Sequence, residues 1–313
     1  VKKMNRVYKK GFFDVGEGHE LYYELYGNPK GAPVVFLHGG PGAGFSKKDY
    51  RFFDPRKFNV LFFDQRGAGK SKTAKPLYAN TTTHLVEDTK KIMKHVGFDK
   101  AIIFGGSWGS CLSMLFAIKH TKMVFGLVLR GIYLADKTAR EHFYLGGIKN
   151  FYPAEFESFI SLVPKKHRKT PEKYYYEKIL HGNKKDQKKY LDEWVRIELS
   201  LLRLAPNQKE LGKEMTGKWH RQFALVECHF LSRNCFLPYD YVIKNVHKFS
   251  HLPVPIVHGR YDMVCPPISA LELHQKLPKS RLFYTIAGHA GQDLENEKKL
   301  VEEVNYMRKI LEK

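Results

Sequence analysis

The chain has 313 residues, of which 43% are hydrophobic and 14% aromatic, so it has enough apolar material for a sizeable core and is not intrinsically disordered. It contains no run of about 18 apolar residues and no apolar segment after its basic start, so we expect neither a transmembrane helix nor a secretory signal. Its four cysteines form no C-x-x-C pair, which favours a cytoplasmic protein without a disulfide framework.

The charge is unusual, because 53 lysines and arginines face 32 acidic residues, a net charge of +21. Such an excess suggests either nucleic-acid binding or a soluble enzyme with a lysine-rich surface. The excess is spread over the chain, and no nucleic-acid-binding motif accompanies it. We therefore predict no specific nucleic-acid partner, but only loose, salt-sensitive binding to polyanions.

Short apolar runs alternate with helical patterns over the first part of the chain. The two expected helices cover about 83–97 and 108–118. The expected strands cover 21–26, 34–37, 60–63, 101–104 and 124–129. Continuous apolar strands separated by helices indicate a mostly parallel sheet with helices on both faces.

This alternation stops after about Tyr133 and resumes at 254–259 with a strand. A helix at about 268–277, a strand at 281–286 and a helix at 295–311 are expected to follow. The intervening part is polar, aromatic and helical in composition. We therefore predict one α/β domain, residues 1–133 with 247–313, and a helical cap over 134–246.

The most informative motif is Gly105–Gly109, with the sequence GGSWG, which lies between an expected strand and an expected helix. A G-x-S-x-G motif in that context is typical of a nucleophile elbow, a sharp turn that exposes the serine at the edge of the sheet. Ser107 is therefore the predicted nucleophile. The alternative is an ordinary turn between a strand and a helix.

A serine hydroxyl needs a base that is oriented by an acid, and in α/β-hydrolases the chain order is Ser, Asp or Glu, His. Asp262 and His289 follow the next two expected strands in that order. We predict that His289 takes the proton of Ser107 and that Asp262 orients His289. Alternatively, Asp262 is a helix N-cap and His289 an ordinary loop residue, one of 15 histidines.

An oxyanion hole needs two backbone amides, one of them from the residue after the nucleophile. That residue is Trp108, and the glycine-rich loop 38–42 (HGGPG) offers Gly40 as the second donor. One such donor lowers the barrier by about 3–4 kcal/mol. The alternative for the loop is a plain glycine turn.

Two cofactor readings fail on the residues. The segment 64–71 (DQRGAGKS) ends like a phosphate-binding P-loop, but Asp64 stands where that loop needs glycine, and a carboxylate repels phosphate. The cysteines and histidines lack the spacing of a zinc site. We therefore expect no cofactor and no metal.

Taken together, these residues resemble the proline iminopeptidases (prolyl aminopeptidases), α/β-hydrolase serine peptidases that remove an N-terminal proline from peptides. The matching segments are HGGPG at 38–42, DQRGAGKS at 64–71, GGSWGS at 105–110, LRGI at 129–132, GRYDMVCP at 259–266 and AGH at 287–289. The resemblance implies an α/β-hydrolase fold with a helical cap and a peptide substrate whose N-terminal proline carries a free, cationic amine.

In this family two glutamates of the cap bind the substrate's amine, and Glu198 and Glu227 match those positions. The resemblance also places Tyr133, Gly39 and Cys265 at the substrate, with Tyr133 standing where the family usually has phenylalanine. A charge-assisted hydrogen bond contributes about 1.5–3 kcal/mol, enough to orient a substrate. The alternative for the glutamates is two ordinary surface residues.

These features predict a serine exopeptidase that releases N-terminal proline through an acyl-enzyme intermediate. One alternative is a related α/β-hydrolase that acts on esters or on a wider range of aminoacyl groups. Two others are a non-catalytic binding protein on the same scaffold and a nucleic-acid-binding protein, the last suggested only by charge.

Overall fold

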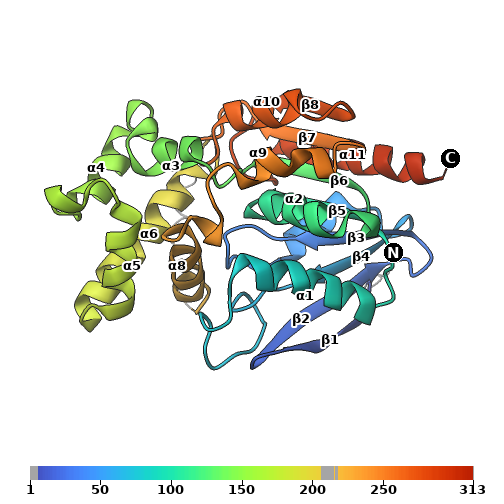
Figure 1. Ribbon diagram of the computed structural model, residues 1–313, viewed down its shortest axis with the longest axis horizontal. Coiled ribbons are helices and arrows are strands. Elements are labelled where there is room, and N and C mark those ends of the chain that lie inside the picture. The colour runs from blue at the N-terminus through green and yellow to red at the C-terminus, as the bar shows by residue number, and fades with distance from the viewer. Residues whose placement is uncertain (1–5, 206–214, 216–217, 313) are drawn as a thin grey trace.

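The centre of the molecule is an eight-stranded sheet with the order β1-β2-β4-β3-β5-β6-β7-β8. The computed structural model describes residues 6–205, 215 and 218–312 (Figure 1). The strands are β1 (Val7–Gly16), β2 (His19–Gly27), β3 (Ala32–Leu37), β4 (Phe58–Phe63), β5 (Ala101–Ser107), β6 (Val124–Ile132), β7 (Val254–Gly259) and β8 (Ser280–Thr285).

The sheet is parallel from β4 to β8, whereas β1 pairs with β2, and β2 with β4, in antiparallel fashion. This confirms the predicted fold class, a mostly parallel sheet with an inserted helical region. The strand β1 was not expected, because its lysines and half-exposed residues hide the apolar pattern. An edge strand tolerates this composition, since only one of its sides is paired.

Successive residues of the central strands point to opposite faces of the sheet, as a period of two requires. Val35 and Ile103 enter the core under α1 (Thr82–His95), α2 (Trp108–His120) and α10 (Pro267–Gln275). Val34 and Ile102 enter the core under α11 (Leu294–Leu311) on the other face. Both faces are therefore buried, which explains the continuous apolar runs in the sequence.

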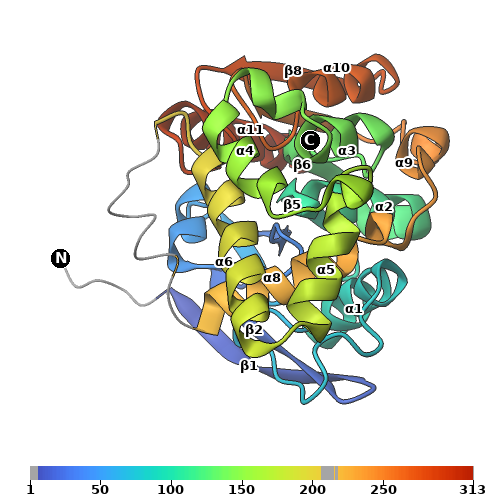
Figure 2. The same ribbon diagram turned by 90° about the vertical axis from the view of Figure 1, so that its left-hand side faces the viewer.

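The helices of the insertion lie between β6 and β7 in the chain. They are α3 (Lys137–Tyr144), α4 (Pro153–Ser161), α5 (Pro171–His181), α6 (Lys184–Leu201), α8 (Lys218–Leu231) and α9 (Tyr241–Asn245). Helices α3 to α8 gather to one side of the sheet in Figure 1, and Figure 2 shows α4, α5 and α6 facing the viewer.

The insertion has a hydrophobic core of its own, built around Trp194, Tyr175 and Phe159. Helices α3 and α6 begin where a short polar side chain, Asp136 or Asn183, accepts a hydrogen bond from the first turn. From Cys235 onward the insertion packs on the core of the sheet instead, which ties the predicted cap to the α/β domain. None of the helices in the described residues is long and apolar enough to span a membrane.

Candidate active site

Ser107 is the last residue of β5 and directly precedes α2, with a left-handed φ of 58°. Neighbouring glycines are required by the close packing of this turn. A Cβ on Gly105 would lie 2.2 Å from the carbonyl oxygen of Gly109, and one on Gly109 would lie 2.0 Å from the carbonyl oxygen of Leu37. The G-x-S-x-G sequence is therefore what allows β5 to turn into α2 and to present the serine.

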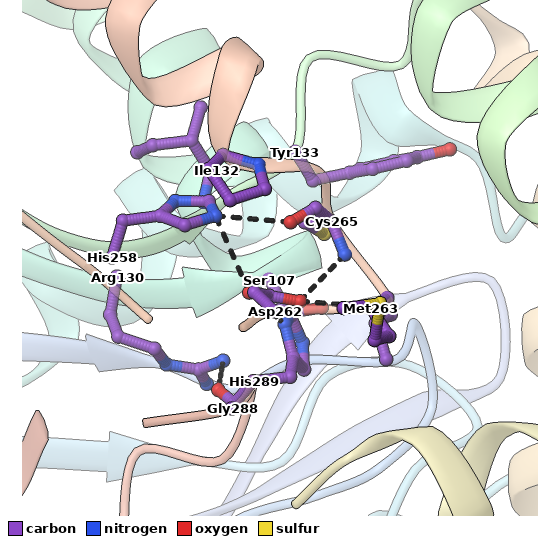
Figure 3. Close-up of polar contacts among 12 residues, drawn as sticks. Ser107, Arg130, Ile132, Tyr133, His258, Asp262, Met263, Cys265, Gly288 and His289 are labelled. Atoms are coloured by element: carbon purple, nitrogen blue, oxygen red, sulfur yellow. Dashed lines mark hydrogen bonds and ion pairs between the residues drawn. The ribbon is translucent and has the colours of Figure 1, made fainter. Parts of the chain in front are cut away.

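Asp262 and His289 form a buried pair at the same edge of the sheet. Asp262 Oδ2 lies 2.7 Å from His289 Nδ1, and Asp262 Oδ1 accepts hydrogen bonds from the amides of Val264 (3.0 Å) and Cys265 (2.8 Å) (Figure 3). Burial alone would raise the pKa of Asp262, but the charge and hydrogen bond of His289 bring it below its ordinary value. The carboxylate is thus ionised and fixed, as an acid that orients a histidine must be.

Gly131 brings this pair next to the serine. In the parallel pairing of β5 and β6, Ser107 lies opposite Ile132, which follows Gly131. Gly131 has a φ of 53°, and a Cβ there would lie 3.0 Å from His289 Cε1 and 3.3 Å from Asp262 Oδ2. The imidazole therefore packs directly on Gly131, beside the nucleophile. No hydrogen bond joins Ser107 to His289 in the structure, and such a catalytic contact commonly tightens only when a substrate is bound.

The loop after β3 approaches Ser107 through two glycines. A Cβ on Gly39 would lie 3.3 Å from Ser107 Cβ. Gly40 has a φ of 105°, and a Cβ on it would lie 2.7 Å from the amide nitrogen of Gly42, so only glycine fits this conformation. Gly40 and Ser107 line the same pocket, which suits the role of oxyanion donor expected for Gly40. Gly39 does not line this pocket but a separate cavity, which it shares with His38 and Arg130.

Buried side chains hold this loop in place. His38 Nε2 accepts a hydrogen bond from the amide of Gln65, and the side chain of Gln65 donates to the His38 carbonyl oxygen, both at 3.0 Å. The indole of Trp108 donates to Gln65 Oε1 at 3.0 Å. Burial lowers the pKa of His38 to about 4, so its imidazole is neutral and accepts this amide. The two predicted oxyanion donors, Gly40 and Trp108, are thus connected through the DQRG segment.

A small pocket of about 50 Å³ contains Ser107 and both candidate anchors for the amine, Glu198 of α6 and Glu227 of α8. These residues are far apart in the sequence, and the folding of the insertion over the sheet edge brings them together. Other residues of the wall are Gly40, Tyr133, Phe143, Tyr144, Leu231, Val264 and Cys265. The pocket thus combines the candidate nucleophile, an apolar surface and two carboxyl groups.

The two glutamates are in contact, and a protonated Glu227 donates a hydrogen bond to Glu198. Glu227 is 1% exposed, and its Oε2 accepts a hydrogen bond from the indole of Trp194 at 2.8 Å. Burial raises the pKa of Glu198 to about 7, and burial together with the charge of Glu198 raises the pKa of Glu227 well above its ordinary value. Without substrate the pair therefore retains a proton at neutral pH. A cation in the pocket would favour its full ionisation.

Tyr133 and Cys265 also line the pocket. The hydroxyl of Tyr133 lies 3.7 Å from Cys235 Sγ, and burial raises the pKa of this phenol well above its ordinary value. Burial raises the pKa of the Cys265 thiol as well, so this cysteine is protonated and is not a thiolate nucleophile. Both residues therefore act as neutral parts of the wall.

Three residues at this site were not predicted from the sequence. The imidazole of His289 packs against Gly131, as described above. Arg130 donates a hydrogen bond from Nη1 to the His289 carbonyl oxygen at 2.6 Å. The side chain of Arg130 also packs on Gly106, where a Cβ would lie 2.3 Å from Nη2. His258 lies behind Asp262, fully buried. Arg130 and Gly131 were visible in the LRGI segment, whereas nothing in the sequence distinguished His258 from the other histidines.

Asp64, which argued against a P-loop, has a structural role here. Its carboxylate accepts hydrogen bonds from the amides of Phe45 (2.9 Å) and Lys70 (2.8 Å) and so joins two loops. No group of three or more histidine, cysteine or acidic residues is arranged to hold a metal ion in the described part of the chain.

Comparison with known proteins places this site in a family. Residues 32–295 match the family model of the α/β hydrolase fold. A proline iminopeptidase of Arabidopsis thaliana is 39% identical over 289 residues, covering 91% of this chain and 76% of the plant protein. A probable proline iminopeptidase of Leptolyngbya boryana is 38% identical, covering 90% of this chain and 89% of its own length.

Solved structures show the same fold at much lower sequence identity. The chain resembles a proline iminopeptidase of Mycobacterium smegmatis with a TM-score of 0.66 and 16% identity, covering 97% of this chain and all of the other. A putative aryl esterase of Burkholderia cenocepacia has a TM-score of 0.69 and 18% identity, covering 97% and 100% of the two chains. At this level the likeness shows the fold alone.

Proposed function

The chain belongs to the proline iminopeptidase family of α/β-hydrolases, and we propose that it releases N-terminal proline from peptides through a covalent acyl-enzyme formed on Ser107. The curated relatives, 35–39% identical over 90% or more of this chain, support this activity. The geometry of the pocket supports the assignment of the individual residues.

In the first half of the reaction the Ser107 hydroxyl attacks the carbonyl carbon of the proline. His289 Nε2 takes the hydroxyl proton and passes it to the leaving amine, while Asp262 stabilises the imidazolium. The amides of Gly40 and Trp108 bind the oxyanion of the tetrahedral intermediate. In the second half His289 activates a water molecule, which hydrolyses the prolyl ester and frees Ser107.

Glu198 and Glu227 select the substrate by its charge. A peptide that begins with proline has a secondary ammonium group next to the scissile bond, so a pocket that holds the ring beside Ser107 must also receive a cation. The two carboxyl groups lie in that pocket, and each would accept a hydrogen bond from the ammonium group. Entry of the substrate would displace the proton that the pair retains.

The observation that carries this proposal is the presence of Ser107, Glu198 and Glu227 in one small pocket. An esterase needs only the nucleophile and its partners, whereas a buried carboxylate, Glu227, in contact with a second one is costly unless a cation joins them. This feature favours an aminopeptidase that requires a free N-terminus over a general esterase.

Intact-mass spectrometry during turnover of prolyl-arylamide tests the proposal directly. We expect the wild-type protein to gain the mass of one prolyl group on Ser107 and to release arylamine. The Ser107→Ala variant should gain no mass and lose all measurable turnover. Full activity of Ser107→Ala on this substrate would overturn the proposal.

A further inference from the structure

His258, in β7, contacts three parts of the active site while being fully buried. Its Nδ1 lies 3.1 Å from the amide nitrogen of Ile132 at the end of β6. Its Nε2 lies 3.0 Å from the Cys265 carbonyl oxygen and 3.5 Å from Asp262 Oδ2, the oxygen that also binds His289 (Figure 3). One imidazole therefore connects β6 with the turn that carries the catalytic acid.

These contacts determine where the imidazole carries its proton. An amide only donates, so Nδ1 must accept from Ile132 and remain unprotonated. The proton is therefore on Nε2, which donates to the Cys265 carbonyl oxygen and also faces Asp262. Burial lowers the pKa of His258 below its ordinary value, which favours the same neutral form.

The course of the strands explains why a side chain is needed here. Backbone pairing between β6 and β7 ends at Arg130 and Val257, because β6 turns away at Gly131 with its left-handed φ. The amide of Ile132 lies beyond the last pair, and His258 accepts the hydrogen bond that β7 no longer offers. An amide buried without a partner at this position would be destabilising.

The same imidazole holds the turn 262–265. In this turn the amides of Val264 and Cys265 donate to Asp262 Oδ1. The carbonyl group of Cys265 points the other way, toward His258 Nε2. Loss of that hydrogen bond would free the peptide plane after Cys265, and the turn that supplies both amides would loosen.

We propose that His258 is a positioning residue for the catalytic acid, an imidazole whose Nε2–H fixes the turn 262–265 and faces the Asp262 carboxylate. This inference rests on the role of Asp262 in the proposed function. His258 acts through Asp262 and does not touch the substrate. Because His258 contacts both the end of β6 and the turn 262–265, the distance between Asp262 and His289 depends on the position of that strand end. The chain continues from there to Tyr133 in the pocket wall.

Charged and titratable groups surround His258 on several sides. They are Asp262 and Cys265 from the turn, Arg130 from β6, His289 from the loop after β8, and Tyr284 from β8. Asp262 and the carbonyl oxygen of Cys265 would stabilise a protonated His258, whereas Arg130 and a protonated His289 oppose it. A change in the pH profile of a His258 variant is therefore to be assigned through Asp262 and His289.

Two variants separate the two hydrogen bonds. His258→Asn keeps an acceptor near the position of Nδ1 for Ile132 but loses the donor toward Cys265 and Asp262. His258→Gln places its amide group near the position of Nε2 and keeps that donor. The rate at which a fluorophosphonate probe labels Ser107, measured from pH 5 to pH 9, reports the triad without involving the glutamates that bind the amine.

We expect His258→Asn to label about 10- to 100-fold more slowly than wild type. The acid limb of its pH profile should move to higher pH, because Asp262 has lost a donor that favours its ionised form. We expect His258→Gln to label within about fivefold of wild type with its acid limb unchanged. Equal losses in both variants without movement of the acid limb would mean a merely structural role and would overturn the proposal.

Two further measurements keep the test decisive. Wild type that is not labelled, or Ser107→Ala that is, would refute the proposed function itself, whereas a normal rate for His258→Asn would refute only the role of His258. If His258→Asn does not fold, ¹⁵N-histidine NMR of the wild-type protein decides. A neutral His258 protonated on Nε2 throughout pH 5–9 is expected, and a titration in this range would contradict the proposal.

Discussion

Two regions of this molecule each bury a carboxylate next to Ser107, and they treat its charge in opposite ways. At the edge of the sheet, Asp262 has two backbone amides and His289 as partners, and its pKa is lowered. In the insertion, Glu227 has the indole of Trp194 and a second carboxyl group, Glu198, and its pKa is raised.

This difference separates machinery from recognition. The α/β domain supplies the partners of its own acid, so Asp262 is held in place and ionised before the substrate arrives. Within the described residues of the insertion, neither Glu198 nor Glu227 forms a salt bridge with a cation, and we infer that the ammonium group of a peptide N-terminus takes that place. In a chain with a net charge of +21, this pair is a local negative site opposite in sign to the whole protein.

Asp262→Asn removes the carboxylate that the α/β domain stabilises with its own residues, and it should have the largest effect on turnover. An asparagine keeps the shape but favours the wrong tautomer of His289, so kcat for prolyl-arylamide should fall about 10³- to 10⁴-fold. Because the glutamates are unchanged, KM should stay within about twofold. Steady-state kinetics at pH 8 measures both, and a variant with a raised KM and a normal kcat would contradict the separation.

Glu227→Gln changes the carboxyl pair of the insertion. It keeps the hydrogen bond from Trp194 but removes a charge that the ammonium group needs, so kcat/KM should fall about 10- to 100-fold. Glu177→Gln, an exposed change on α5, is the matched control and should leave kcat/KM unchanged. Equal kinetics for Glu227→Gln and the control would remove this glutamate from substrate binding.

The pH dependence of KM sharpens the comparison. Since the pKa of Glu198 is raised to about 7, the pair holds an extra proton below that pH, and the substrate's cation must compete with it. KM for prolyl-arylamide should therefore rise about 10-fold as the pH falls from 8 to 6. Glu198→Gln should flatten this rise, and a KM that is flat in the wild type would contradict the shared proton.

The smallest expected effect is on the free energy of unfolding of Glu198→Gln. We expect this variant to be more stable than the wild type although it is less active. With its pKa raised in the folded state, Glu198 binds more protons when folded than when unfolded between about pH 4.5 and 7. Its contribution to stability is thus present at low pH and lost as the pH rises through 7. At pH 8, Glu198→Gln should raise the free energy of unfolding by about 1–3 kcal/mol. Urea denaturation measures this, and a destabilised variant would contradict it.

The sequence allowed most of the α/β domain and the order of Ser107, Asp262 and His289 to be predicted, because apolar runs and the G-x-S-x-G turn are local patterns. The glutamates came only from family resemblance, since Glu198 and Glu227 lie on two helices whose packing no local pattern reports. His258 was missed for a different reason. A buried histidine in a strand has no signature, and its role depends on where β6 and β7 stop pairing.

The central claim is that the insertion provides negative charge for the amine of an N-terminal proline. Its most direct test compares kcat/KM for prolyl-arylamide with that for N-acetylprolyl-arylamide, which has no cation. We predict that wild type prefers the free amine by at least about 1,000-fold and that the preference collapses in the double variant Glu198→Gln with Glu227→Gln. Equal cleavage of both substrates by the wild type would contradict the claim.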